Sequence, residues 1–153
     1  MTQRIPYQKA APDVVQAMRA LEQQARRTTI EPAILELVRM RASQLNGCAY
    51  CIDMHSKDAR AAGETEQMLY ALDAWRETPF FTDREQAALA WTEAVTLVAD
   101  GHVPDDVYEL ARARFDEREL VELTLAIVAI NGWNRLAISF RAVAGTYKPG
   151  SHG

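Results

Sequence analysis

The amino-acid sequence predicts an all-α protein with a single domain built around helical hairpins. No segment alternates apolar and polar residues as a half-buried strand does, and nearly every segment between turn residues repeats its apolar residues with the helical period. The chain has 153 residues, of which 48% are hydrophobic, and this is enough for one domain with a core of its own. We therefore expect a fold that needs neither disulfides nor zinc, which leaves the two cysteines free for chemistry.

Start and stop signals divide the first half of the chain into helices. After an irregular opening, an amphipathic helix is expected to end at 27–29. Pro32 opens the next helix, because proline is favoured in the first helical turn, and Asn46-Gly47 ends it, because glycine adopts the left-handed conformation that closes many helices. Gly63 ends a third helix in the same way. The expected helices of this half are 14–27, 32–46, 48–62 and 66–75.

The second half begins with a capping-box pattern, in which the Thr82 hydroxyl and the Glu85 carboxylate are three residues apart. Asn131-Gly132 is expected to break the most apolar helix, as the same dipeptide does after the second helix. This echo predicts a repeated helical hairpin, of which only the first copy keeps cysteines. The expected helices are 83–100, 104–115, 117–130 and 133–144, and the tail, 148–153, is expected to be disordered.

Composition limits the classes of partner. The net charge is −4 without a run of basic residues, so we do not expect nucleic acid to bind. The longest apolar run, 125–130, is far shorter than the ~20 residues of a membrane span. The N-terminal residues lack the apolar core of a secretory signal. We therefore expect a cytoplasmic protein that does not bind membranes, and in a reducing cytosol a close cysteine pair more often serves catalysis or metal binding than stabilisation.

Cys48, Cys51 and His55 form the constellation that carries chemistry. Spacings of three and four residues place all three side chains on one face of a helix. Because Cys48 directly follows the Gly47 break, the cysteine pair lies in the first helical turn, where the helix dipole favours negative charge. Thiols at helix N-termini and beside histidine have lowered pKa values, and the thiolate is the reactive form. The pattern predicts an activated thiol.

Glu36 is the candidate carboxylate for this site. It lies about 16 Å back along its helix from Gly47, and His55 lies about 12 Å along the next helix, at ~1.5 Å per residue. If the two helices form an antiparallel hairpin, Glu36 and His55 lie at similar depth. The carboxylate could then orient His55 as the base of a nucleophile.

Other interpretations of these residues remain open at this point. The cysteine pair could bind a metal or be purely structural, His55 could be a structural histidine, and Glu36 could be a surface residue. A structural zinc site usually has four ligands, and the other histidines, His102 and His152, come without a second cysteine pair. We therefore expect neither a metal nor a cofactor.

The segment 36–55 resembles the core of the alkylhydroperoxidase D-like proteins, which belong to the carboxymuconolactone decarboxylase family. The match in spacing includes the glutamate, the Cys-x-x-Cys pair and the following histidine, and it covers about 31–63 of a domain expected to span 1–153. The resemblance implies an all-α fold that assembles as homo-trimers or homo-hexamers. It also implies reduction of hydroperoxides with electrons from a small thiol or from a protein dithiol, such as a lipoyl or thioredoxin-like protein.

The resemblance further implies a role for each residue of the site. Cys51 attacks the peroxide, His55 and Glu36 relay the proton, and Cys48 resolves the sulfenic acid as a disulfide. The position at the helix end favours Cys48 as the exposed partner of the reductant. The best-known members carry histidine between the cysteines where this chain has Tyr50, whose reference pKa of about 10 excludes it as a base near neutral pH.

Three function classes follow from these residues. The leading hypothesis is a thiol-dependent peroxidase in antioxidant defence. A general thiol–disulfide oxidoreductase or redox sensor uses the same residues without a useful peroxidase rate. A decarboxylase-like enzyme of the same family, or a non-catalytic assembly protein whose cysteines are vestigial, is the weaker interpretation.

Overall fold

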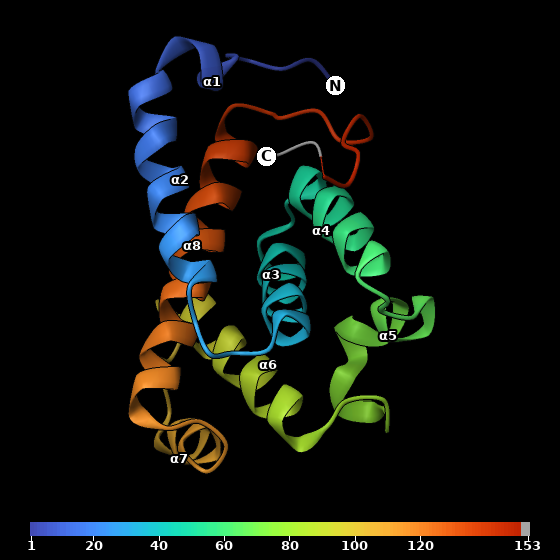
Figure 1. The fold of residues 1–153 in the computed structure, drawn as a ribbon, viewed down its shortest axis with the longest axis vertical. Coiled ribbons are helices and arrows are strands. Elements are labelled where there is room, and N and C mark those ends of the chain that lie inside the picture. The colour runs from blue at the N-terminus through green and yellow to red at the C-terminus, as the bar shows by residue number, and fades with distance from the viewer. Residues whose placement is uncertain (151–153) are drawn as a thin grey trace.

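The computed structural model describes residues 1–150, and in this part the backbone forms helices, turns and irregular segments without a strand. In chain order the helices are α1 (Tyr7–Ala10), α2 (Pro12–Arg26), α3 (Pro32–Asn46), α4 (Ala49–Ala61), α5 (Glu66–Ala71), the 3-10 helix η1 (Leu72–Glu77), α6 (Asp83–Thr96), α7 (Asp105–Arg112) and α8 (Glu117–Ser139). The predicted all-α class is confirmed (Figure 1).

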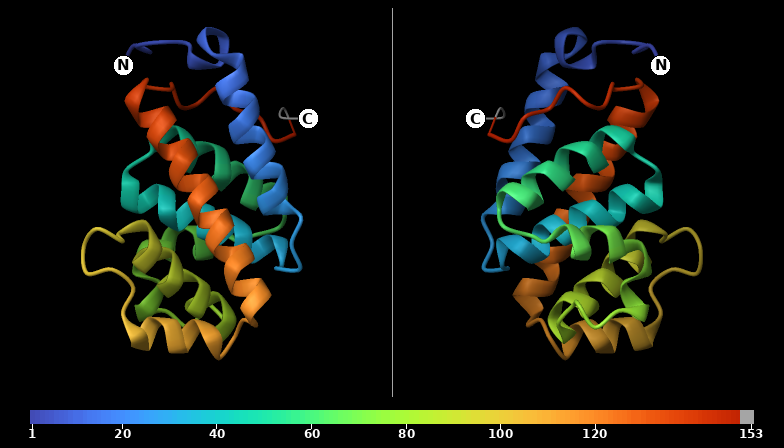
Figure 2. Two further views of the ribbon diagram at one scale, coloured as in Figure 1. Left: turned by 90° about the vertical axis from the view of Figure 1, so that its left-hand side faces the viewer. Right: turned by 90° about the vertical axis from the view of Figure 1, so that its right-hand side faces the viewer.

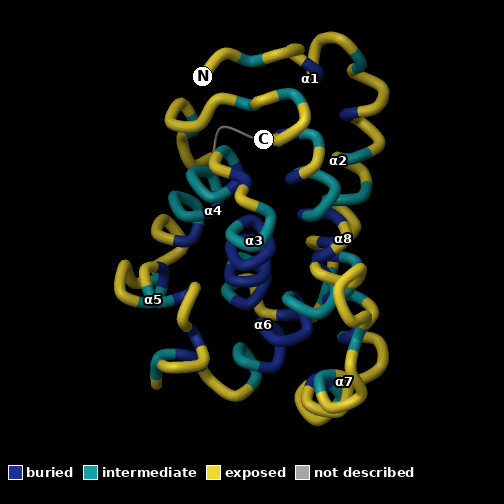
Figure 3. The backbone as a smooth tube through the Cα atoms, turned by 180° about the vertical axis from the view of Figure 1, so that it is seen from behind, coloured by how far each residue is buried: buried dark blue, intermediate teal, exposed yellow. Residues whose placement is uncertain are grey.

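Helix α3 lies in the middle of the fold, with α2 and α8 on one side and α4 on the other (Figure 1). Its backbone is buried along most of its length (Figure 3). One side of α3 packs with α6 and α8 in the largest hydrophobic cluster, and the other side packs with η1 and α6 in a second cluster. Because apolar residues surround α3, it forms the rigid centre on which the neighbouring helices are placed.

The hairpin of α3 and α4 forms as predicted. Gly47 has a φ of +68°, in the left-handed region, and its backbone ends α3 one residue before Cys48. Helix α4 then starts at Ala49 and packs against α3. The capping box of Thr82 and Glu85 at the start of α6 is likewise confirmed.

The predicted break at Asn131-Gly132 is wrong, because α8 continues without interruption through both residues (Figure 2). A Cβ atom on Gly132 would lie 2.8 Å from Cε of Met18 on α2. This glycine therefore allows two helices to approach each other and does not end one. The side chain of Asn131 donates to Ile127 O and Thr96 Oγ1, which integrates it into the helix packing. The predicted repeat of the hairpin is wrong for the same reason.

Because α8 is continuous, it is a much longer apolar element than the run 125–130 alone suggested. At 23 residues it is long and apolar enough to cross a membrane by length and composition. Two surfaces of α8 are in contact with α2 and α3, and its residues Leu123, Ala126 and Ile127 are buried in the largest cluster. These contacts bury 39% of the most apolar part of the helix inside the fold.

After α8 the chain returns over α4 as an irregular segment (Figure 1). The predicted helix to 144 is therefore wrong beyond Ser139, and Arg141 takes a left-handed φ of 53° at this point. We call 140–150 the C-terminal strap. Disorder is predicted for 148–153, and 151–153 of this tail lie outside the described part of the chain.

Candidate active site

Cys48 and Cys51 form a disulfide at the start of α4, with their Cα atoms 5.4 Å apart. Cys48 is the N-cap residue of α4, and its Sγ accepts a hydrogen bond of 3.4 Å from the backbone N–H of Cys51. The two sulfur atoms therefore lie where the unpaired N–H groups of the first turn favour negative charge.

Both cysteines are buried, with 1% of each residue exposed. They pack against Ala42 of α3 and against Ile130 and Ala137 of α8, and a second layer of partly buried residues covers them. That layer contains Tyr50, Trp133 and Ala142. The expectation of an exposed Cys48 is wrong, because α8 and the C-terminal strap, both distant in sequence, cover the helix end.

His55 and Glu36 are in direct contact. Nδ1 of His55 lies 3.1 Å from Oε2 of Glu36, so the hairpin places the two side chains at the same depth, as the sequence predicted. His55 is four residues after Cys51 on α4, and both residues are buried. An ionised carboxylate can only accept hydrogen bonds, so Nδ1 carries the proton and Nε2 keeps a free lone pair in the neutral ring. This tautomer can accept a thiol proton at Nε2.

His55 and Arg39 together keep Glu36 ionised. Its Nη1 lies 2.7 Å from Oε1 of Glu36, one turn away on α3. Burial alone would raise the pKa of Glu36, but the hydrogen bond from His55 and the positive charge of Arg39 outweigh it and lower that pKa to about 2. Glu36 is therefore a carboxylate throughout the physiological range, and it acts on His55 through charge and orientation.

Sequence reasoning did not single out Arg39 as a residue of the site. The residue is only 2% exposed, and its Nη2 lies 3.0 Å from Oε1 of Glu22 on α2. A signal for this role existed in the sequence. Arg39 directly follows the apolar pair Leu37 and Val38, so a charge interrupts the most apolar part of a helix that is buried on all sides.

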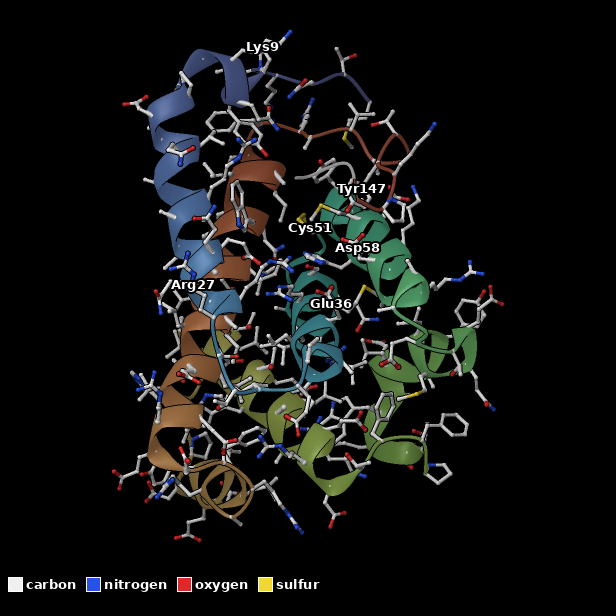
Figure 4. The ribbon with its side chains drawn as sticks, in the orientation of Figure 1. Lys9, Arg27, Glu36, Cys51, Asp58 and Tyr147 are labelled. Atoms are coloured by element: carbon white, nitrogen blue, oxygen red, sulfur yellow. A yellow bond between two sulfur atoms is a disulfide. The ribbon has the colours of Figure 1, made fainter. Side chains whose placement is uncertain are left out.

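The C-terminal strap closes the site from above α4. Tyr147 Oη donates to Asp58 at 2.7 Å, Gly145 N–H donates to Asp53 at 3.0 Å, and Lys57 donates to the carbonyl of Tyr147 at 3.2 Å. Figure 4 shows Tyr147 beside Asp58 and on the same side of the fold as Cys51. Burial, the hydrogen bond to Asp58 and nearby negative charges raise the pKa of Tyr147 to about 12.

Tyr50, between the two cysteines, is half-buried. Burial and the charge of Asp53 raise the pKa of its phenol. This side chain therefore stays neutral near neutral pH and packs against the cysteine cluster. Among residues 1–150, no three His, Cys, Asp or Glu side chains come together as the ligands of a metal ion.

The family model of the carboxymuconolactone decarboxylase family matches residues 12–94, which include all four candidate residues. The chain belongs to the carboxymuconolactone decarboxylase family. A relative in Bacillus subtilis, the uncharacterized protein YdfG, is 44% identical over 91% of this chain and 95% of its own length. The similarity to this relative thus extends beyond the residues that the family model matches.

Solved structures agree with this fold. A protein of unknown function from Agrobacterium tumefaciens, assigned only provisionally to antioxidant defence as an AhpD protein, superposes with a TM-score of 0.92. It is 42% identical, and the match covers 95% of this chain and all of that chain. The debrominase Bmp8 has a TM-score of 0.80 at 19% identity, over 90% of this chain and 74% of its own, and shares the fold alone. The AhpD-like fold is therefore common to several functions.

Proposed function

We propose that the protein is a thiol-dependent peroxidase that reduces organic hydroperoxides or hydrogen peroxide through a dithiol–disulfide cycle. The observation that carries the proposal is the single helix that has Cys48 and Cys51 at its start and His55 one turn further on, with Glu36 bound to the histidine ring. Paired thiols one turn apart, a base on the same helix face and a carboxylate on that base are the parts of an activated nucleophile.

The cycle begins with the reduced pair. His55 Nε2 takes the proton of Cys51, and the thiolate attacks the terminal oxygen of ROOH. The O–O bond breaks, ROH leaves with the proton returned by His55, and Cys51 becomes a sulfenic acid. The Cys48 thiol then attacks the Cys51 sulfur, an S–S bond forms and water leaves. The resulting state has the disulfide of Figure 4.

A dithiol or two small thiols then reduce the disulfide by thiol–disulfide exchange. The donor in this proposal is a small thiol or a protein dithiol of the lipoyl or thioredoxin-like kind, as the family resemblance implies. A cytoplasmic location supplies such thiols in reduced form. The same resemblance leads us to propose a homo-trimer or homo-hexamer as the working assembly, with a role in antioxidant defence.

The test mixes the reduced protein with one equivalent of cumene hydroperoxide and follows intact mass and free thiols over seconds. We expect the loss of two hydrogens and of both thiols in the wild type. Cys51→Ser should not react, and Cys48→Ser should stop at the Cys51 sulfenic acid, which a dimedone adduct reports. Oxidation of the wild type no faster than that of free cysteine would reject the peroxidase.

A second function uses the same residues. Tyr50 stands where the best-known peroxidases of this type have histidine, and it cannot supply a second base. This favours a general thiol–disulfide oxidoreductase as the alternative. The comparison of rates with cumene hydroperoxide and with oxidised glutathione decides between them, because only the oxidoreductase prefers the disulfide.

A further inference from the structure

Four charged or titratable side chains form a continuous chain across three helices. Glu22 on α2 lies 3.0 Å from Nη2 of Arg39, and Nη1 of Arg39 lies 2.7 Å from Oε1 of Glu36 on the same helix α3. Oε2 of Glu36 lies 3.1 Å from Nδ1 of His55 on α4. Arg26 adds a further contact to Glu22 at 2.9 Å. The histidine of the thiol site is thus connected to a helix that contributes no residue to the cysteine cluster.

Arg39 is costly for the fold. Its guanidinium is almost completely buried, Nη2 is held by an ion pair with Glu22 at 3.0 Å, and Nε has no hydrogen-bond partner within residues 1–150. Buried donors without partners destabilise a protein, and apolar residues often replace buried ion pairs without loss of stability. Stability alone therefore does not explain an arginine at this position, whereas its contact with Glu36 connects it to the site.

We infer that Arg39 is a positioning residue of the thiol site, which holds Glu36 ionised and aligned so that His55 offers Nε2 as the base. The inference deepens the proposed function and, for its effect on turnover, rests on it. In this arrangement the two oxygens of the Glu36 carboxylate bind different partners. Oε1 is bound by Arg39, and Oε2 is thereby turned towards His55.

Loss of Arg39 should reverse the tautomer of His55. Without the guanidinium, the interaction with His55 is left as the main one that opposes the effect of burial, so the pKa of Glu36 rises, and a cavity of about 470 Å³ is lined by Glu36 and Arg39. A protonated Glu36 can donate to Nδ1, which then becomes the acceptor and leaves the proton on Nε2. In this state His55 cannot take a proton from Cys51.

The other groups that face Glu36 do not replace Arg39. Arg26 on α2 lowers the pKa of Glu36 less than Arg39 does and is half exposed, and Glu31, which also lines the cavity, is paired with Arg84. Tyr147 of the strap is close enough for the charge of Glu36 to raise its pKa, and a neutral phenol does not oppose protonation of Glu36. Arg39 is therefore the dominant cation at this carboxylate.

The test uses the reduced full-length chain with Cys48→Ser, so that only Cys51 can react. We compare Arg39→Met and Arg39→Lys with the same parent by the rate of iodoacetamide alkylation from pH 4 to pH 9. Arg39→Met should slow alkylation about 100-fold at pH 6, the lower end of what general base catalysis contributes, and should add an acid limb above pH 4. Arg39→Lys, which keeps the charge, should recover part of the rate.

Arg41→Met is the matched control. Arg41 is a second buried arginine on α3, two residues away, and it is paired with Glu93 on the other side of the helix. Its replacement removes a buried charge without contact with Glu36 or His55. An alkylation profile of Arg39→Met that equals that of Arg41→Met would overturn the inference.

The tautomer of His55, read from ring ¹⁵N shifts in NMR, gives a second measurement. The wild type should carry the proton on Nδ1 and Arg39→Met on Nε2, and an unchanged tautomer would overturn the inference. Should Arg39→Met fail to fold, Arg39→Gln, which removes the charge but keeps hydrogen-bond donors, replaces it in both measurements. Neither measurement needs peroxide, so a failed peroxidase assay in the wild type rejects the proposed function and leaves the role of Arg39 to be decided separately.

Discussion

The hydroxyl group of Tyr147 donates a hydrogen bond of 2.7 Å to Asp58, a residue 89 positions earlier on α4. This bond fastens the C-terminal strap to the helix that carries Cys48 and Cys51. Ala142, in the same strap, packs against the cysteine cluster. Access to the thiols therefore depends on a segment whose position no local sequence pattern predicts.

Tyr147→Phe should make the reduced thiols more accessible. The change removes one hydrogen bond, worth about 1 kcal/mol, and so should raise the open population of the strap about fivefold. The measurement is the rate of reaction of the reduced protein with a bulky disulfide reagent at pH 8. Tyr70→Phe is the matched control, because Tyr70 is 76% exposed and belongs to α5. Equal rates for both variants would show that the strap does not limit access.

Glu36 should make the stability of the fold depend on acid pH. Its pKa is lowered from 4.5 to about 2 in the folded chain, so its contribution is complete above the unfolded value and disappears as the pH falls towards 2. A shift of this size corresponds to about 3 kcal/mol. Urea unfolding should thus show a steeper loss of stability between pH 5 and pH 3 for the wild type than for Glu36→Gln.

The control for this measurement is Glu117→Gln at the start of α8, where the side chain is 92% exposed. It should follow the wild-type curve. A Glu36→Gln variant with the wild-type slope would contradict the lowered pKa of Glu36.

The effect of Gly132→Ala on stability should depend on the side chain of Met18. In an exposed helix interior, glycine to alanine stabilises by about 1 kcal/mol, but a Cβ at this position would lie 2.8 Å from Met18 Cε. Gly132→Ala should therefore stabilise the Met18→Ala protein by about 1 kcal/mol and the wild type by clearly less. Thermal unfolding of the four proteins measures this coupling, and additive effects would show that the contact is not tight.

Replacement of Gly47 by alanine should destabilise the protein, and this effect should not depend on Met18. Its φ of +68° is a conformation that costs an L-residue roughly 1–2 kcal/mol, and nothing lies near a Cβ at this position. Gly47→Ala should thus destabilise by about 1 kcal/mol whatever residue occupies position 18, whereas Gly47→Asn should lose less because asparagine tolerates the left-handed region. Urea unfolding checks both, and equal losses would show that backbone strain is not the cause.

The two Asn-Gly dipeptides explain how far the sequence predicts the fold. Pro32 and Gly47 act locally, so the bounds of α3 and the start of α4 could be predicted. The same dipeptide at 131–132 lies within a helix because Gly132 faces Met18, and a contact between residues so far apart leaves no local pattern. The prediction therefore failed where a tertiary contact, and not backbone conformation, required the glycine.

In the candidate site, too, local sequence patterns predict some relationships and tertiary contacts determine the others. Cys48, Cys51 and His55 share one helix face by spacing alone, and the depth of Glu36 follows from the length of the hairpin. The role of Arg39 depends on burial by α2, and the burial of Cys48 depends on α8 and the strap. These relationships required the three-dimensional structure.

The position of Cys48 as the N-cap of α4 links oxidation state to helix stability. A cap accepts hydrogen bonds from the first turn, and a sulfur atom that carries negative charge accepts them better than a neutral disulfide sulfur, because the helix dipole adds to the attraction. Whatever free energy the first turn gives to a thiolate is given, by thermodynamic reciprocity, to the reduced form of the pair. The helix start thus favours reduction of this disulfide to the extent that the reduced Cys48 is ionised.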